Sequence, residues 1–192
     1  PCTYADKWCI VDVASGSPTP RDEACFVMVA GKAYLIGGRG VHPTDVFDPA
    51  DNSWTAKSPT PKEMNHMQCV AYNNSVYIAG GWYGQFPYEQ NHEEMFVYDV
   101  ASDSWSTRPY LPNNPERRRG GAAFVLSDDG KMYLVGGNIG GHGSHSKSQA
   151  LFDVYDPVRN TWNERGMMPD AIHRRDHTGG AMVSGKLCVA SG

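Results

Sequence analysis

The sequence predicts an all-β fold built from repeated four-stranded units, and three observations carry this prediction: recurring glycine pairs, recurring tryptophans and constant spacings between them. The pairs follow apolar segments at Gly37-Gly38, Gly80-Gly81 and Gly136-Gly137, with Ser191-Gly192 in the same position after a fourth. The tryptophans that recur at the equivalent position are Trp8, Trp54, Trp105 and Trp162. Successive pairs start 43, 56 and 55 residues apart, as expected for repeats that carry loop insertions.

The spacing inside the repeats is constant although their length varies. A turn-forming residue precedes each pair by six positions: Gly31, Asn74, Gly130 and Gly185. The residue three positions before each pair is Tyr34, Tyr77, Tyr133 or Cys188. An aspartate stands six residues before each later tryptophan: Asp48, Asp99 and Asp156. Three such registers together indicate a true structural repeat.

Each repeat is therefore predicted to form four antiparallel strands joined by short turns. In the second repeat the strands are expected at 68–72, 76–79, 95–98 and 105–107, with a tight hairpin turn at Asn73-Asn74. A lone four-stranded sheet cannot bury both faces, so the units must stack around an axis as blades of a β-propeller. We expect almost no helix, and we expect Trp54, Trp105 and Trp162 to be mostly buried between adjacent blades.

A glycine pair, a later Tyr-Asp or Phe-Asp and then a tryptophan resemble the kelch repeat over residues 21–192, with a departure at Ser191. The resemblance implies a partial kelch-type propeller with blades at about 21–58, 66–108 and 119–165 and a half blade at 175–192. Residues 1–20 would supply the outer strand of a preceding blade and a link. Because kelch propellers close with about six or seven blades, we expect a fragment of a longer chain.

The composition is that of a globular protein and excludes several classes of function. The 192 residues are 40% hydrophobic and carry a net charge of −4, without the basic excess that a nucleic-acid partner requires. No apolar run is long enough to span a bilayer, and no signal peptide is recognisable. We therefore expect neither a nucleic-acid partner nor a membrane span.

The five cysteines cannot all pair within the chain. Cys25 and Cys69 lie in apolar strand patterns and are expected to be free, buried residues that act as small hydrophobes. Cys2 and Cys9 lie close together and are the better candidates for a disulfide.

Strand order predicts that the longest loops, at 39–45, 82–94 and 138–150, share one face with the links 59–66, 109–119 and 168–176. Aromatic and arginine side chains there favour binding, although some aromatics could instead pack beneath their loop and some arginines could pair with blade carboxylates. The predicted binding residues are Arg39, Trp82, Tyr83, Phe86, Tyr88, Arg118, His142 and Arg174. The hairpin turns at Asn74 and Gly130 should lie on the opposite face.

A glycine-rich loop at 140–146 raises the question of a metal, because His142 and His145 are close in sequence and His92 or His173 could converge on them. Glycine-rich loops with histidines are mostly solvated, so we expect no metal site and no cofactor. No nucleophile–base pair stands out by its spacing, and we expect no catalytic residues.

These features favour a non-catalytic binding module that presents propeller loops to a protein or glycan partner. The resemblance has two further implications. One is a copper-radical oxidase similar to galactose oxidase, whose two histidines, two tyrosines and crosslinked cysteine we cannot match to positions here. The other is an intracellular substrate-adaptor propeller. The resemblance to the galactose-oxidase-like branch, seen in the segment 175–181 followed by 185–189, favours an extracellular or secreted protein, with the cytoplasm as the alternative.

Overall fold

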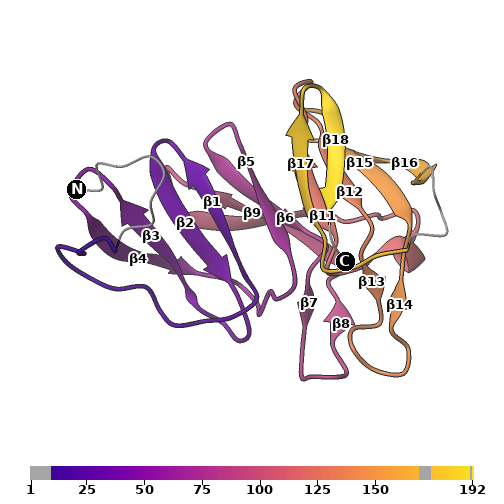
Figure 1. Ribbon diagram of the computed structural model, residues 1–192, viewed down its shortest axis with the longest axis horizontal. Helices are drawn as coiled ribbons and strands as arrows, with labels where there is room; N and C mark the ends of the chain where they lie inside the picture. Colours follow the sequence, from indigo (N-terminus) through magenta and orange to yellow (C-terminus); the bar gives the residue numbers. More distant parts are fainter. Residues whose placement is uncertain (1–9, 169–173, 191) are drawn as a thin grey trace.

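The computed structural model describes residues 10–168, 174–190 and 192. They form three four-stranded antiparallel sheets, a two-stranded hairpin from the fourth repeat and two short two-stranded ribbons (Figure 1). The one helical element among these residues is a single 3-10 turn at Pro115–Arg117. None of the described helical segments is long and apolar enough to cross a membrane. The all-β prediction is confirmed.

The first blade consists of β1 (Ala24–Val29), β2 (Lys32–Gly37), β3 (Pro43–Asp48) and β4 (Ser53–Pro59), paired in that order. The second consists of β5 (Gln68–Tyr72), β6 (Ser75–Ala79), β9 (Glu94–Asp99) and β10 (Ser104–Pro109). The third consists of β11 (Ala123–Leu126), β12 (Met132–Val135), β15 (Leu151–Asp156) and β16 (Thr161–Met167). The final hairpin consists of β17 (Gly179–Val183) and β18 (Lys186–Ala190).

The blades pack side by side around an axis that their first strands line. Strand β5 contacts β1 on one side and β11 on the other, and β11 also contacts β17. Successive side chains along the strands of the second blade point to opposite faces of the sheet, so each face packs against a different neighbouring blade. Val76 and Ile78 join the apolar cluster shared with the first blade, whereas Ala79 joins the cluster shared with the third. The second blade therefore buries both faces, as the repeat predicts.

The glycine pairs end the second strand of each blade where the next link passes close by. Gly37 has a φ of 75°, and a Cβ there would lie 2.6 Å from the Met64 carbonyl oxygen. Both the left-handed conformation and the close approach require glycine. The pair thus lets the link between blades cross directly over the strand end.

The three tryptophans occupy equivalent places on the outer strands, but they are partly rather than fully buried. Trp105 packs on Tyr98 and donates from Nε1 to the carbonyl of Ser58 in the first blade, at 3.3 Å. Trp162 donates in the same way to Pro109 of the second blade, at 2.8 Å. The outer strands lie at the rim of the propeller, so the preceding blade covers only part of the indoles of Trp105 and Trp162.

The expectation that Cys25 and Cys69 are free is wrong, because they form a disulfide with a Cα–Cα distance of 5.9 Å. The two residues lie on the neighbouring inner strands β1 and β5. A pattern of apolar residues reports burial but not which strands become neighbours around the axis. Cys2 and Cys9, the pair favoured by the sequence, lie outside the described residues.

Candidate functional site

The long loops gather at one end of the blades, as the strand order predicts. The ribbons β7 (Trp82–Tyr83) with β8 (Gln90–Asn91) and β13 (Asn138–Ile139) with β14 (Lys147–Ser148) both extend from this end (Figure 1). The β5–β6 and β11–β12 hairpin turns lie at the other end, where Gly130 faces the ring of Tyr72. We call the end that carries the two ribbons and the links between blades the loop face.

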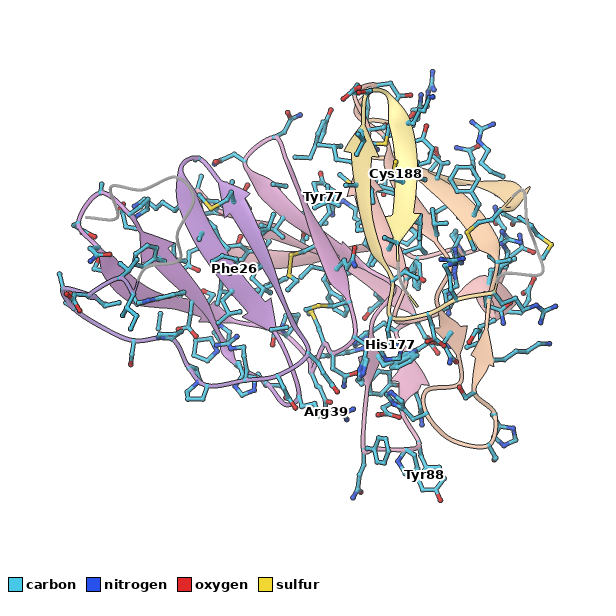
Figure 2. The ribbon with its side chains drawn as sticks, in the orientation of Figure 1. Phe26, Arg39, Tyr77, Tyr88, His177 and Cys188 are labelled. Carbon is cyan, nitrogen blue, oxygen red and sulfur yellow. A yellow bond between two sulfur atoms is a disulfide. The ribbon has the colours of Figure 1, made fainter. Side chains whose placement is uncertain are left out.

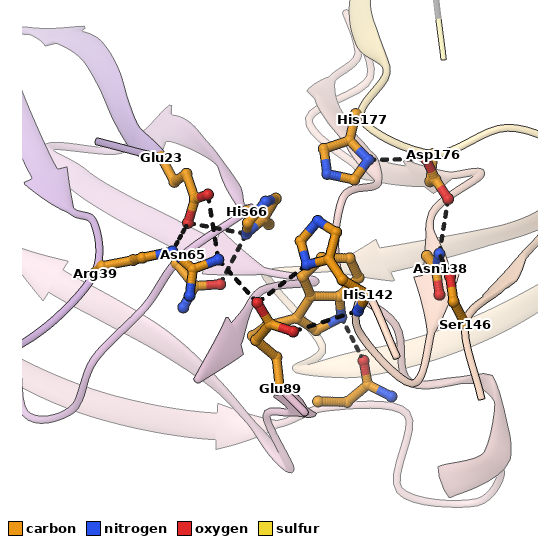
Figure 3. Close-up of polar contacts among 12 residues, drawn as sticks. Glu23, Arg39, Asn65, His66, Glu89, Asn138, His142, Ser146, Asp176 and His177 are labelled. Carbon is orange, nitrogen blue, oxygen red and sulfur yellow. Dashed lines mark hydrogen bonds and ion pairs between the residues drawn. The ribbon is translucent and has the colours of Figure 1, made fainter. Parts of the chain in front are cut away.

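Three histidines meet at the centre of the loop face. His66 precedes β5, His142 lies between β13 and β14, and His177 precedes β17. The ring centroids are 4.7 Å apart for His66 and His142, 4.9 Å for His66 and His177, and 5.5 Å for His142 and His177. One ring nitrogen from each lies within 4.8 Å of the others. We refer to these residues as the histidine trio (Figure 3).

Two members of the trio come from a position that recurs in every blade. The residue two places before the first strand, or one place before it in the first blade, has a positive φ in all four repeats. These residues are Glu23 (φ 55°), His66 (φ 50°), Gly121 (φ 62°) and His177 (φ 53°). Positive φ is uncommon outside glycine, so the link between blades imposes this conformation. The conformation directs one residue per blade toward the axis.

Each histidine of the trio is oriented through its Nδ1 atom. Nδ1 of His142 donates to Glu89 Oε1 at 3.0 Å, and Nδ1 of His177 donates to Asp176 Oδ1 at 2.8 Å. Nδ1 of His66 donates to the amide oxygen of Asn65 at 2.9 Å, with Glu23 Oε2 at 3.2 Å. Carboxylate and amide oxygens accept hydrogen bonds, so Nδ1 is the protonated nitrogen in each ring. The lone pair of each neutral imidazole is then on Nε2.

Arg39 links two of these carboxylates, with Nε 2.7 Å from Glu23 Oε2 and Nη2 2.8 Å from Glu89 Oε1. Burial opposes the ionisation of Glu89, but hydrogen bonds from Arg39 and His142 outweigh it and lower the pKa of Glu89 to about 2. Burial, together with the nearby His177 and His142, lowers the pKa of His66 to about 4. At neutral pH the site therefore holds an ionised Glu89 and an uncharged His66.

The predicted binding aromatics divide into buried and exposed pairs. Trp82 is fully buried, stacks against the trio with a centroid distance of 4.7 Å to His66, and donates from Nε1 to Asn91 Oδ1 at 2.9 Å. Tyr83 is partly buried and packs on His92. In contrast, Phe86 is 61% and Tyr88 is 77% exposed. The alternative that some aromatics support their loop is thus confirmed for Trp82.

The predicted basic residues are mostly engaged within the protein. Arg118 donates from Nε to the Tyr110 carbonyl at 2.8 Å, and its neighbours Arg117 and Arg119 both pair with buried Asp153 at 2.7 Å. The alternative of a structural arginine is confirmed for this set. At the equivalent link Arg174 is exposed, and His173 lies outside the described residues.

The group weighed as a metal alternative, His142 and His145 with His92 or His173, is not the one that converges, because His142 lies beside His66 and His177. His145 is exposed on the same ribbon. His92 is buried and packs between Tyr83 and Phe96. His66 and His177 stand fourteen residues before the glycine pair, or its Ser191-Gly192 equivalent, of their own repeats, as Glu23 does in the first repeat. An alignment of the repeats would therefore have shown that the three positions are equivalent. That signal was available, whereas the approach of His142 depends on loop geometry.

A pocket of about 430 Å³ adjoins the trio along the axis. Its lining includes Glu23, His66, Gly121 and His177, which precede the first strands, and Gln68 and Gly179 on the inner strands. The pocket places two imidazoles and one carboxylate where a bound group could reach them.

A family model, the KLHDC2/KLHL20/DRC7 Kelch-repeats domain, matches residues 3–192. The chain belongs to the kelch-repeat family. The expectation from the glycine, aspartate and tryptophan spacings is therefore confirmed. A solved structure, that of YjhT, shares the fold of the kelch chain with a TM-score of 0.71 at 15% identity, covering 85% of this chain and 56% of that one.

Several curated proteins are similar to the kelch chain. Kelch-like protein 35 of Mus musculus is 27% identical over 161 residues, which is 80% of this chain and 24% of that protein. Kelch-like protein terF of Aspergillus terreus is 25% identical over 190 residues, which is 93% of this chain and 40% of that protein. Human Kelch repeat and BTB domain-containing protein 12 is 28% identical over 178 residues, 83% of this chain and 28% of that protein. The kelch chain spans less than half the length of these relatives.

Proposed function

We propose that the kelch chain is a non-catalytic binding module that presents its loop face to a protein partner. The observation that carries the proposal is the exposure of Phe86 (61%) and Tyr88 (77%) on the loop between β7 and β8. Figure 2 places Tyr88 at the tip of this ribbon, below Arg39 and His177. Large exposed aromatic residues are typical anchors of protein interfaces, and no blade packing requires them here.

The surroundings of this aromatic pair suit a partner that enters the axis. Phe86 lies 5.3 Å from His142 between ring centroids, so the pair adjoins the histidine trio. The neighbouring pocket of about 430 Å³ is large enough for a side chain or a short loop. Arg174 is an exposed cation on the link before β17.

A glycan partner would use the same aromatic residues by stacking on sugar rings. The oxidase alternative requires a cysteine beside a tyrosine at the metal. Within the described residues, the hydrogen bonds and ring contacts of the trio involve neither residue type, and Cys25 and Cys69 are joined in a disulfide. These observations favour binding over oxidase chemistry.

The names of the relatives bear on the setting in which the module works. One human relative is a kelch repeat and BTB domain-containing protein, and an Arabidopsis thaliana relative is a putative F-box/kelch-repeat protein. These relatives favour the cytoplasmic adaptor alternative over a secreted protein. Disulfides such as Cys25–Cys69 persist in oxidising compartments and are rare in the cytosol. Alkylation in cells without reductant tests the setting: labelled Cys25 and Cys69 would favour the cytoplasm, and protected ones a secreted protein.

The test compares a loop-face variant with a matched variant at the opposite end. The double substitution Phe86→Ala with Tyr88→Ala removes both exposed aromatics. Val158→Ala is the control, since Val158 is 82% exposed and lies beside Gly130 at the hairpin end. Quantitative affinity capture from the source cells, followed by binding measurements with the purified partner, should show a partner lost by the double variant and kept by Val158→Ala.

Equal retention of that partner by the double variant would refute the proposed binding face. The same three proteins are applied to a glycan array. Binding to glycans that depends on Phe86 and Tyr88, with no protein partner retained by the wild type, would replace the protein partner with a glycan.

A further inference from the structure

We propose that His66, His142 and His177 bind one divalent transition-metal ion of the zinc type at the loop-face end of the propeller axis. The three residues come from three separate segments, and one ring nitrogen from each lies within 4.8 Å of the other two. Figure 3 shows the three rings converging on one another, with their carboxylate partners on the outside.

The ring nitrogens of the trio lie within 4.8 Å of one another, a wider limit than the spacing in an assembled three-histidine metal centre. With zinc–nitrogen distances of about 2.0–2.1 Å, tetrahedral geometry brings ligand nitrogens to about 3.4 Å from one another. Modest side-chain rotations would close the trio to that spacing. The side chains of His142 and His177 are 27% and 44% exposed, so they have room to rotate, whereas His66 at 6% is held in place.

The hydrogen bonds of the trio match the second shell of a metal site. Metal-ligating histidines commonly donate their other ring N–H to a carboxylate, which sets the tautomer and makes the ligand more basic. Here Nδ1 of His142 and Nδ1 of His177 each donate to a carboxylate, and Nδ1 of His66 donates to the Asn65 amide oxygen with Glu23 at 3.2 Å, so each Nε2 is left as a potential ligand. Packing against Trp82 alone would not require an acceptor at Nδ1 of every ring.

The second shell is itself held in place. Ser148 Oγ and Asn138 Nδ2 donate to Asp176 Oδ2 at 2.7 and 2.8 Å, which leaves Oδ1 for His177. Glu89 is fixed by Arg39, and its side chain is fully buried. These contacts restrain two of the three carboxylates before any ion arrives, which lowers the cost of assembling the site.

The local charge balance also favours a divalent cation. The three carboxylates, Glu23, Glu89 and Asp176, carry three negative charges, and Arg39 contributes one positive charge to this network. A net charge of −2 in these groups would be neutralised by one divalent ion. Neutral imidazoles suit zinc, copper, nickel and cobalt, and three protein ligands leave a fourth position for water or an incoming group.

The experiment uses tag-free, chelator-treated protein and Zn²⁺ as the probe in isothermal titration calorimetry. We expect one ion per chain for the wild type. His142→Ala and His177→Ala should each weaken binding at least about tenfold, the lower range seen when metal-site interactions are lost. His145→Ala is the matched control, because it removes an exposed histidine from the same β13–β14 ribbon and should leave the affinity unchanged.

Two further readouts separate metal binding from folding. Zn²⁺ should raise the melting temperature of the wild type but not of His142→Ala, while both apo proteins give the same circular-dichroism spectrum. Co²⁺ should give the visible absorption of a tetrahedral site in the wild type and in His145→Ala only. The proposal is overturned if the trio variants bind Zn²⁺ as tightly as the wild type, or if His145→Ala loses as much affinity as they do.

Discussion

The Cys25–Cys69 disulfide should contribute substantially to stability, because it staples two blades through their inner strands. The two residues are 44 positions apart in sequence. A crosslink that closes a loop of this length reduces the entropy of the unfolded chain by an amount worth about 4 kcal/mol at 25 °C. We therefore expect the double substitution Cys25→Ala with Cys69→Ala to lower the free energy of unfolding by about 4 kcal/mol.

Urea denaturation followed by tryptophan fluorescence measures this loss, and two controls isolate its cause. Reduced wild-type protein should unfold like the double variant, since both lack the crosslink. Cys188→Ser should have no effect, because Cys188 is a free, exposed cysteine on β18 (Figure 2). A double variant that loses less than about 1 kcal/mol, with peptide mapping confirming the bond in the wild type, would refute the entropic argument.

Two other perturbations test the burial of single side chains. Burial lowers the pKa of His92 to about 4 in the folded protein. Below pH 6.5 the unfolded chain therefore takes up a proton at His92 that the folded protein does not. The free energy of unfolding should then fall by about 3 kcal/mol as the pH drops from about 6.5 to about 4. His66 titrates in the same range, so the measured quantity is the difference in pH dependence between wild type and His92→Phe; identical profiles would exclude a contribution from His92. Trp105→Ala should lower the free energy of unfolding by about 2–3 kcal/mol in urea denaturation, which is below the roughly 3–5 kcal/mol of a fully buried large aromatic because the indole is partly exposed. A loss below about 1 kcal/mol would mean that Trp105 does not hold the second blade against the first.

The fold could be predicted from the sequence because its determinants are local and repeated. The hairpin turn at Asn73-Asn74 and the alternation along β6 each depend on neighbours a few residues away. Four repetitions of the same spacing then leave a radial stack as the way to bury both faces of each sheet. The strand order also placed the long loops on one face correctly.

The site was predicted less well, because it depends on contacts between blades. Trp82 stands in a loop and reads as a surface residue, yet the ribbon folds it against His66 and beneath the loop. His142 finds its partners 76 and 35 residues away rather than at the nearby His145. The pairing of Cys25 with Cys69 likewise follows from which strands become neighbours at the axis. Spacing along one chain does not report such distances.

The left-handed position ahead of each first strand has a consequence for engineering the propeller. A glutamate, a histidine, a glycine and a second histidine all adopt φ between 50° and 62° there. This backbone position thus accepts glutamate, histidine and glycine, because the link between blades rather than the residue type sets the conformation. Residues at this position could therefore be substituted in one blade at a time, which would change the side chains that face the axis while the sheets keep their structure.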